Sequence, residues 1–127
     1  PQSEHPHGLS DVEYDSLFTK DTPVIFAFHG YRTLIHELTY DRHNKNMTVL
    51  GYKEEGTITT PFDMRVQNNI DRFSIVLEAV NSIPSLGSKG AYLAQLMRDK
   101  LVEHKQYIAD HGIDLPEVAN WEWKSIK

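Results

Sequence analysis

The sequence contains no cysteine, and this absence excludes two kinds of structure. Disulfide bonds cannot form, and neither can metal sites built on thiolates. A metal site would need three or four histidine or carboxylate ligands, whereas His5 and His7 offer only a pair separated by a proline. We therefore expect no metal ion in this chain. A chain without cysteine is compatible with a reducing compartment, and we expect a cytoplasmic protein.

Long apolar runs and an excess of positive charge are also missing. The longest apolar run, Val24 to Phe28, is far shorter than the roughly 20 residues that span a membrane. The first residues, Pro1 to His5, lack both the regions of a signal peptide and an initiator methionine, which fits a fragment or processed chain. The net charge is −5, whereas nucleic-acid binders usually carry a basic face. We expect neither a membrane nor a nucleic acid as a partner.

Signature motifs of common nucleotide-binding and hydrolytic enzymes are absent as well. The sequence contains neither the P-loop pattern G-x-x-x-x-G-K-[ST] nor the dinucleotide-binding pattern G-x-G-x-x-G. The run from Leu86 to Gly90 comes nearest to the nucleophile motif G-x-S-x-G, but leucine occupies its first position. A free-standing hydrolase that uses His29 is therefore disfavoured.

The residues that are present suffice for one globular domain. The chain has 127 residues, of which 39% are apolar and 24% are charged, as in ordinary globular proteins. We expect a single domain over residues 1–127 that begins with an extended lead-in over residues 1–9. In the tail over residues 113–127, Trp121 and Trp123 each carry a large apolar area, and we expect both to pack against the body.

Two apolar segments predict a parallel strand–helix–strand unit. Residues 23–28 form a continuous apolar run, typical of a strand buried on both faces, which His29-Gly30 ends. Residues 47–52 form the second strand candidate. Between them we expect a helix over residues 31–38 and a polar loop over residues 41–46. The packing side of that helix carries Leu34, Ile35 and Leu38.

Capping residues predict the other helices. Ser10 and Glu13 form a capping box, Pro61 and Asp71 suit helix starts, and Gly112 suits a helix end. The expected helices cover residues 11–18, 62–68, 72–82 and 88–111, and their apolar faces carry Val12, Leu17, Phe18, Phe73, Val76, Leu77, Val80, Leu93, Met97, Leu101, His104 and Ile108. On that face we expect His104 to make a core or interface contact rather than to act as a ligand or catalyst. The elements together predict a helix-rich α/β fold with a small, mostly parallel sheet flanked by helices.

Polar segments follow both expected strands, at the sheet edge where ligands bind in open α/β folds. The first segment is His29, Gly30 and Tyr31, for which a tight turn and a hydrogen bond are the simpler interpretation. The second segment is a loop whose last residues either extend or follow the second strand. Its candidate residues are Lys53, Glu54, Glu55, Thr57, Thr59 and Thr60. Such side chains suit a sugar or phosphate ligand, and they equally suit a subunit interface or a structural loop.

Several long strings resemble phosphoketolases. The strings are His5 to Asp11, Val24 to Tyr31 (V-I-F-A-F-H-G-Y), Gly51 to Met64 (G-Y-K-E-E-G-T-I-T-T-P-F-D-M), Lys89 to Leu93, and Lys100 to Ile108. They follow one another in order over nearly the whole chain. The resemblance implies the C-terminal domain of a transketolase-like, cytoplasmic enzyme. It also implies cleavage of xylulose 5-phosphate, and often fructose 6-phosphate, with phosphate to acetyl phosphate, an aldose phosphate and water.

The same resemblance implies thiamine diphosphate and magnesium as cofactors of the full-length enzyme, held by its upstream domains. The cofactor motif of thiamine enzymes, G-D-G followed by N-N, is incomplete here, because Asn68-Asn69 has no G-D-G partner. We therefore expect no cofactor-binding and no catalytic residue in this chain.

The expected role of the chain is structural, dimer-forming or regulatory, with the upstream domains and a second copy as partners. If strands that precede His5 in the family are missing, the first strand has an unpaired edge that another strand can cover. The alternative is a phosphate or sugar-phosphate binding module without catalysis, built from His29, Tyr31, Lys53 and the threonine loop.

Overall fold

The computed structural model describes residues 8–53 and 58–124, which fall into two compact units divided between Tyr52 and Lys53. The first contains α1 (Asp11–Phe18), β1 (Val24–Tyr31), α2 (Arg32–Thr39) and β2 (Met47–Tyr52). The second contains α3 (Pro61–Gln67), α4 (Arg72–Asn81), the 3-10 turn η1 (Pro84–Leu86), α5 (Gly87–His111) and α6 (Pro116–Ala119). The expectation of a single domain stays a prediction.

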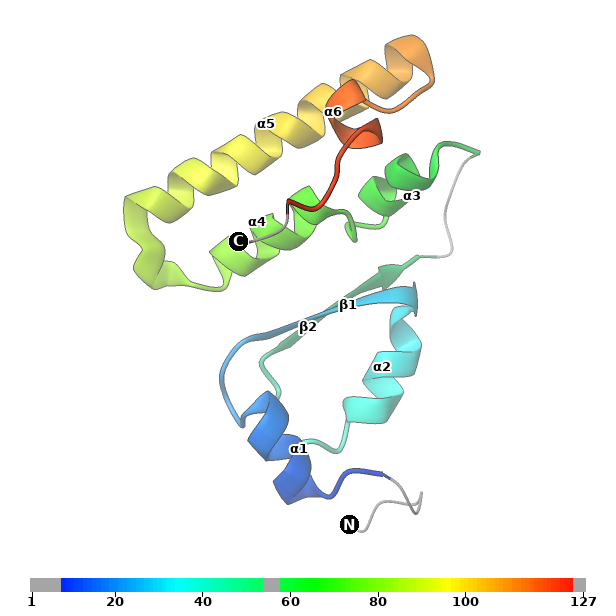
Figure 1. Ribbon diagram of the computed structural model, residues 1–127. Helices are drawn as coiled ribbons and strands as arrows, with labels where there is room; N and C mark the ends of the chain where they lie inside the picture. Colours follow the sequence, from blue (N-terminus) through cyan, green and yellow to red (C-terminus); the bar gives the residue numbers. More distant parts are fainter. Residues whose placement is uncertain (1–7, 54–57, 125–127) are drawn as a thin grey trace. The chain divides into compact units, whose positions relative to one another are not determined.

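The first unit is the predicted parallel strand–helix–strand arrangement. Strands β1 and β2 pair in parallel, with Val24 opposite Met47, and α2 lies beside them (Figure 1). The strand β1 does not end at His29, because it continues to Tyr31 after a break in register that begins at Ala27. The α/β prediction is confirmed, with a two-stranded sheet among the described residues.

Burial in the first unit differs from the prediction. The strand β1 is half-buried or exposed along its whole length rather than buried on both faces. Leu34 and Leu38 of α2 are exposed, as are Val12 and Leu17 of α1. The buried apolar side chains here are Tyr14, Ile35 and Val49. The physical reason is size, since a two-stranded sheet and helices of eight residues can enclose only a few side chains.

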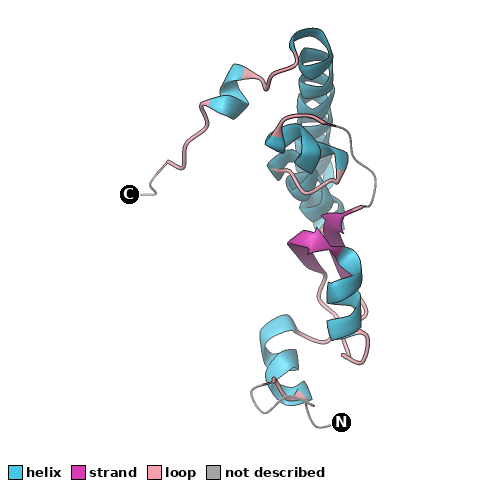
Figure 2. Ribbon diagram, turned by 90° about the vertical axis from the view of Figure 1, so that its right-hand side faces the viewer, coloured by secondary structure: helices cyan, strands magenta, loops and turns pink. Residues whose placement is uncertain are grey.

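The second unit is helical. Helices α4 and α5 are joined by η1 and run side by side in opposite directions (Figures 1 and 2). Phe62, Phe73, Leu115 and Val118 form the core, against which Met97 and Leu101 of α5 pack. The predicted boundaries hold closely, because Asp71 caps α4 and Gly112 adopts a left-handed conformation after α5, with φ of 69°.

The tail follows the prediction only in part. Leu115 and Val118, at the start and inside α6, are buried in the core. Trp121 is 45% exposed and its ring contacts Arg72, whereas Trp123 is 86% exposed, so the prediction of packing against the body is wrong for Trp123. Leu115 and Val118 pack against Phe62 and Phe73 in the core, and the Trp121 ring lies 5.0 Å from the guanidinium of Arg72.

Candidate functional site

The carboxyl ends of the two parallel strands bring His29 and Tyr52 together. The Tyr52 hydroxyl lies 2.5 Å from Nε2 of His29, and the rings meet edge-on with centroids 4.9 Å apart. Tyr31 is 58% exposed and precedes α2 without a capping hydrogen bond from its side chain. Sequence reasoning missed Tyr52, although a residue at the end of the second parallel strand must lie at the same edge as His29.

Gly30 lies within β1, in the register break, rather than in a tight turn after the strand. Its carbonyl oxygen faces Gly51 of β2, where an added Cβ would lie 2.6 Å from that oxygen. Gly51 therefore serves the close approach of the two strand backbones.

The described residues of the second polar segment make hydrogen bonds in and around α3. The backbone N–H of Lys53 donates to Oδ1 of Asn68 at 2.6 Å. The hydroxyl of Thr59 donates to Oδ2 of Asp63 at 2.7 Å, and the hydroxyl of Thr60 donates to Oδ1 of Asp114 at 2.5 Å. These hydroxyl protons are used inside the protein, which favours the structural-loop interpretation. The remaining candidates, Glu54, Glu55 and Thr57, lie outside the described residues.

A buried polar pair connects α3 with α5. Nε2 of His104 lies 2.9 Å from Oδ1 of Asp63, and the imidazole is fully buried. Its ring stands edge-on to Phe62 with centroids 5.1 Å apart. Nδ1 of His104 has no hydrogen-bond partner among the described residues, and its solvent exposure is negligible. The prediction of a core contact for His104 is confirmed, and its burial prevents it from acting on a ligand in this arrangement.

The Asp63 carboxylate is the charged end of this pair. Burial raises the pKa of Asp63, but hydrogen bonds from Thr59, His104 and Gln67 outweigh burial and hold the pKa below its ordinary value of 3.8. The Asp63 carboxylate therefore stays ionised at neutral pH, although Asp63 is only 7% exposed.

A pocket of about 560 Å³ lies among α3, α4 and α5, with Asp63 in its wall. Its lining is Asp63, Val66, Gln67, Asn69, Ser74, Leu101, Val102, Lys105, Ile108 and Ala109. Sequence reasoning did not find this pocket, because its residues come from three helices whose packing no local pattern specifies.

Residues 8–53 and 58–124 offer neither a cluster of metal ligands nor a helix that could cross a membrane. No group of three or more histidine and carboxylate side chains there could hold a metal ion. The pair His5 and His7 lies outside the described residues. Within the same ranges, no helix combines the length and apolar character that crossing a bilayer requires.

Comparison with known proteins identifies the family. The model of the XFP C-terminal domain matches residues 1–123. A probable phosphoketolase of Clostridium acetobutylicum is 64% identical over 97% of this chain, and one of Nitrosospira multiformis is 60% identical over 98%. A probable phosphoketolase 2 of a Nostoc species is 54% identical over 97% of the chain. The chain spans 16% of the length of each of these relatives. It therefore belongs to the XFP C-terminal domain family, the C-terminal domain of phosphoketolases.

Proposed function

We propose that this chain is the C-terminal domain of an enzyme that cleaves xylulose 5-phosphate, fructose 6-phosphate or both with inorganic phosphate. The products are acetyl phosphate, an aldose phosphate and water. The observation that carries the proposal is the family match over residues 1–123, together with relatives named probable phosphoketolase at up to 64% identity. The role of the domain itself is structural, dimer-forming or regulatory, and the isolated chain is inactive.

Thiamine diphosphate and magnesium would supply the carbon–carbon cleavage in the full-length enzyme. The residues described here do not fit that cofactor. Oδ1 of Asn68 accepts from Lys53, and its Nδ2 donates to the carbonyl of Met64. Asn69 follows the C-cap of α3, with φ of 58°, and its N–H donates to the carbonyl of Val66. Because the Asn68-Asn69 pair serves the end of a helix, we assign no step of the reaction to it and place cofactor binding in the upstream domains.

The upstream domains of the same protein are the first partner that we propose. Among the described residues β1 pairs only with β2, and its apolar run is half-buried or exposed. Parallel strands of this composition are ordinarily covered on both faces, and an open edge accepts another strand. A strand from the longer protein would satisfy this edge. In the isolated chain a second copy would take its place, which makes the chain prone to dimerise.

A phosphate or sugar-phosphate module is the second candidate function. The observation that favours it is the exposed His29–Tyr52 pair at the carboxyl ends of the strands. Thr59 and Thr60 are not expected to contribute to such a site, because their hydroxyl protons are already donated to Asp63 and Asp114.

An acetyl phosphate assay on the full-length enzyme and on the 127-residue chain tests the main proposal. We expect turnover by the full-length enzyme and none by the isolated chain. Turnover by the isolated chain would contradict the proposal. Calorimetric titration of the chain with phosphate, xylulose 5-phosphate and thiamine diphosphate separates the two functions. Binding of phosphate or sugar phosphate that His29→Ala abolishes would establish the second candidate, whereas no binding supports a structural domain.

A further inference from the structure

The pocket among α3, α4 and α5 has the size and walls of a small-ligand site. Its volume of about 560 Å³ falls in the range of roughly 300–1,000 Å³ that is typical of such sites. The apolar part of the wall consists of Val66, Leu101, Val102, Ile108 and Ala109. Since all its lining residues belong to the second unit, the pocket is complete within one compact part of the chain.

One buried charge stands in this wall, the carboxylate of Asp63. Its Oδ2 accepts hydrogen bonds from Thr59 at 2.7 Å and Gln67 at 2.9 Å, while Oδ1 lies 2.9 Å from Nε2 of His104. Among the described residues no lysine or arginine forms an ion pair with it. A carboxylate oxygen has about two acceptor positions, so Oδ1 retains one for a further donor.

We propose that this pocket binds a small organic cation, an ammonium or guanidinium group on an apolar body. The cationic group donates to Oδ1 of Asp63, and the apolar body lies against Leu101, Val102 and Ile108. A ligand that carries phosphate or carboxylate is disfavoured beside Asp63, because two like charges repel each other. The site thus differs in place and in charge preference from the phosphate site considered at His29.

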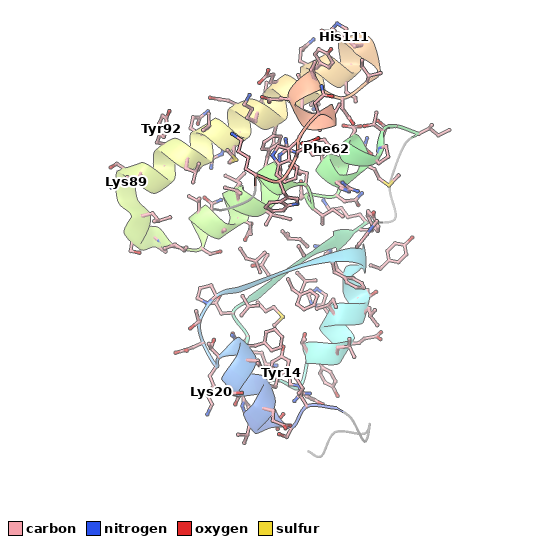
Figure 3. The ribbon with its side chains drawn as sticks, viewed as in Figure 1. Tyr14, Lys20, Phe62, Lys89, Tyr92 and His111 are labelled. Atoms are coloured by element: carbon pink, nitrogen blue, oxygen red, sulfur yellow. The ribbon has the colours of Figure 1, made fainter. Side chains whose placement is uncertain are left out.

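Replacing Lys105 tests whether the pocket prefers a positively charged ligand. Lys105 lines the same pocket but is exposed, so its ammonium group opposes a bound cation weakly through solvent. Lys89 lies near the opposite end of α5, close to Tyr92 and far along the helix from His111 (Figure 3). Replacing either lysine with glutamate makes the same change in net charge, but only Lys105 lines the pocket.

The test is titration of the 127-residue chain with phenethylammonium, followed by NMR of its backbone amides. The matched probes are 3-phenylpropanoate, an anion, and 2-phenylethanol, which is neutral. We expect the ammonium compound to bind at least about tenfold more tightly than the alcohol, as a charge-assisted hydrogen bond implies. The amide signals of Val102, Lys105 and Ala109 should shift.

Three pocket variants and one control variant decide whether the pocket carries this binding. Asp63→Asn should weaken binding about tenfold, and Lys105→Glu should strengthen it roughly two- to threefold, with Lys89→Glu unchanged as the control. Ala109→Trp, at an exposed position of the lining, should block the pocket and abolish binding.

The proposal is overturned by any of several results. The first is no binding of the ammonium compound up to about 10 mM. The second is equal binding of the anion, and the third is binding that Ala109→Trp leaves intact. If Asp63→Asn does not fold, the opposite responses expected of Lys105→Glu and Ala109→Trp still decide the matter.

Discussion

Gly51 occupies the point where the two strand backbones come closest. An added Cβ there would lie 2.6 Å from the carbonyl oxygen of Gly30 and 2.9 Å from Cγ of Arg32. Gly30 is less restricted, because the atom closest to its own added Cβ, at 2.5 Å, is Cε1 of the Phe28 ring. A side-chain ring can rotate away, whereas a backbone carbonyl inside a strand pair cannot.

Gly51→Ala is therefore expected to lower the free energy of unfolding by about 2 kcal/mol, the usual cost of overpacking against fixed atoms. Urea denaturation followed by circular dichroism measures the change. Gly30→Ala is the matched control and should cost less than half as much. Equal losses at the two positions would show that the backbone approach at Gly51 is not the cause.

Asp63 should make stability depend on pH in the acidic range. Its folded-state pKa lies below the ordinary value of 3.8, so its contribution is fully present above that value. As the pH falls through the folded-state pKa, the carboxylate becomes protonated and the contribution is lost. Unfolding measured between pH 7 and about pH 2.5 should show a loss of stability on acidification that is smaller in Asp63→Asn. An unchanged pH profile in that variant would contradict this role.

Removing the Asp63 carboxylate altogether should also be costly at neutral pH. Asp63→Ala leaves His104 buried with neither ring nitrogen paired, since Nδ1 already lacks a partner. We expect a loss of about 3 kcal/mol in the free energy of unfolding, measured by urea denaturation. A loss below about 1 kcal/mol would mean that the pair contributes little.

At the scale of elements, the short helices α1 and α3 begin at side chains that cap them. Ser10 and Glu13 form the predicted capping box of α1, and the backbone hydrogen bond from Ser10 lowers the pKa of Glu13. Thr60 caps α3 by accepting from the backbone N–H of Asp63 at 3.1 Å, and it also donates to Asp114 between α5 and α6. One hydroxyl thus fixes the start of α3 and ties it to the segment that carries the core residue Leu115.

Thr60→Val removes that hydroxyl while keeping the shape of the side chain. We expect it to lower the free energy of unfolding by about 1–2 kcal/mol, with Thr60→Ser retaining most of the stability. Thermal denaturation of the three proteins makes the comparison. If Thr60→Val were as stable as the original but weakened binding of a phosphate ligand, the hydroxyl would serve the ligand rather than the helix.

At the scale of the whole molecule, the open edge of β1 should govern association. Ala27 lies on this strand in an exposed position, and a lysine in an open edge strand opposes pairing with another strand. We expect the 127-residue chain to show concentration-dependent dimerisation in sedimentation, and Ala27→Lys to shift it toward monomer. Ala91→Lys, at an exposed position on α5, is the control and should leave association unchanged. If the chain were a monomer at all concentrations, dimerisation through the open edge of β1 would be contradicted.

The sequence by itself determined the local elements and the family. Capping residues and terminating glycines act within a few residues of the chain, so Ser10, Pro61, Asp71 and Gly112 predicted helix boundaries that the structure confirms. The two apolar segments, separated by a helix and a polar loop, likewise predicted the parallel strand pair. The long strings shared with phosphoketolases indicated the family that the match over residues 1–123 identifies.

Only the tertiary structure decided which apolar side chains are buried and which polar groups meet. Leu34, Leu38 and Trp123 are large apolar residues of the kind found in cores, yet they are exposed. Whether such a side chain is buried depends on which other elements pack against it. Asp63 and His104 are 41 residues apart on two different helices, so no local spacing predicts that they meet. The pocket that Asp63 lines exists only where α3, α4 and α5 converge, since each helix contributes just part of its wall.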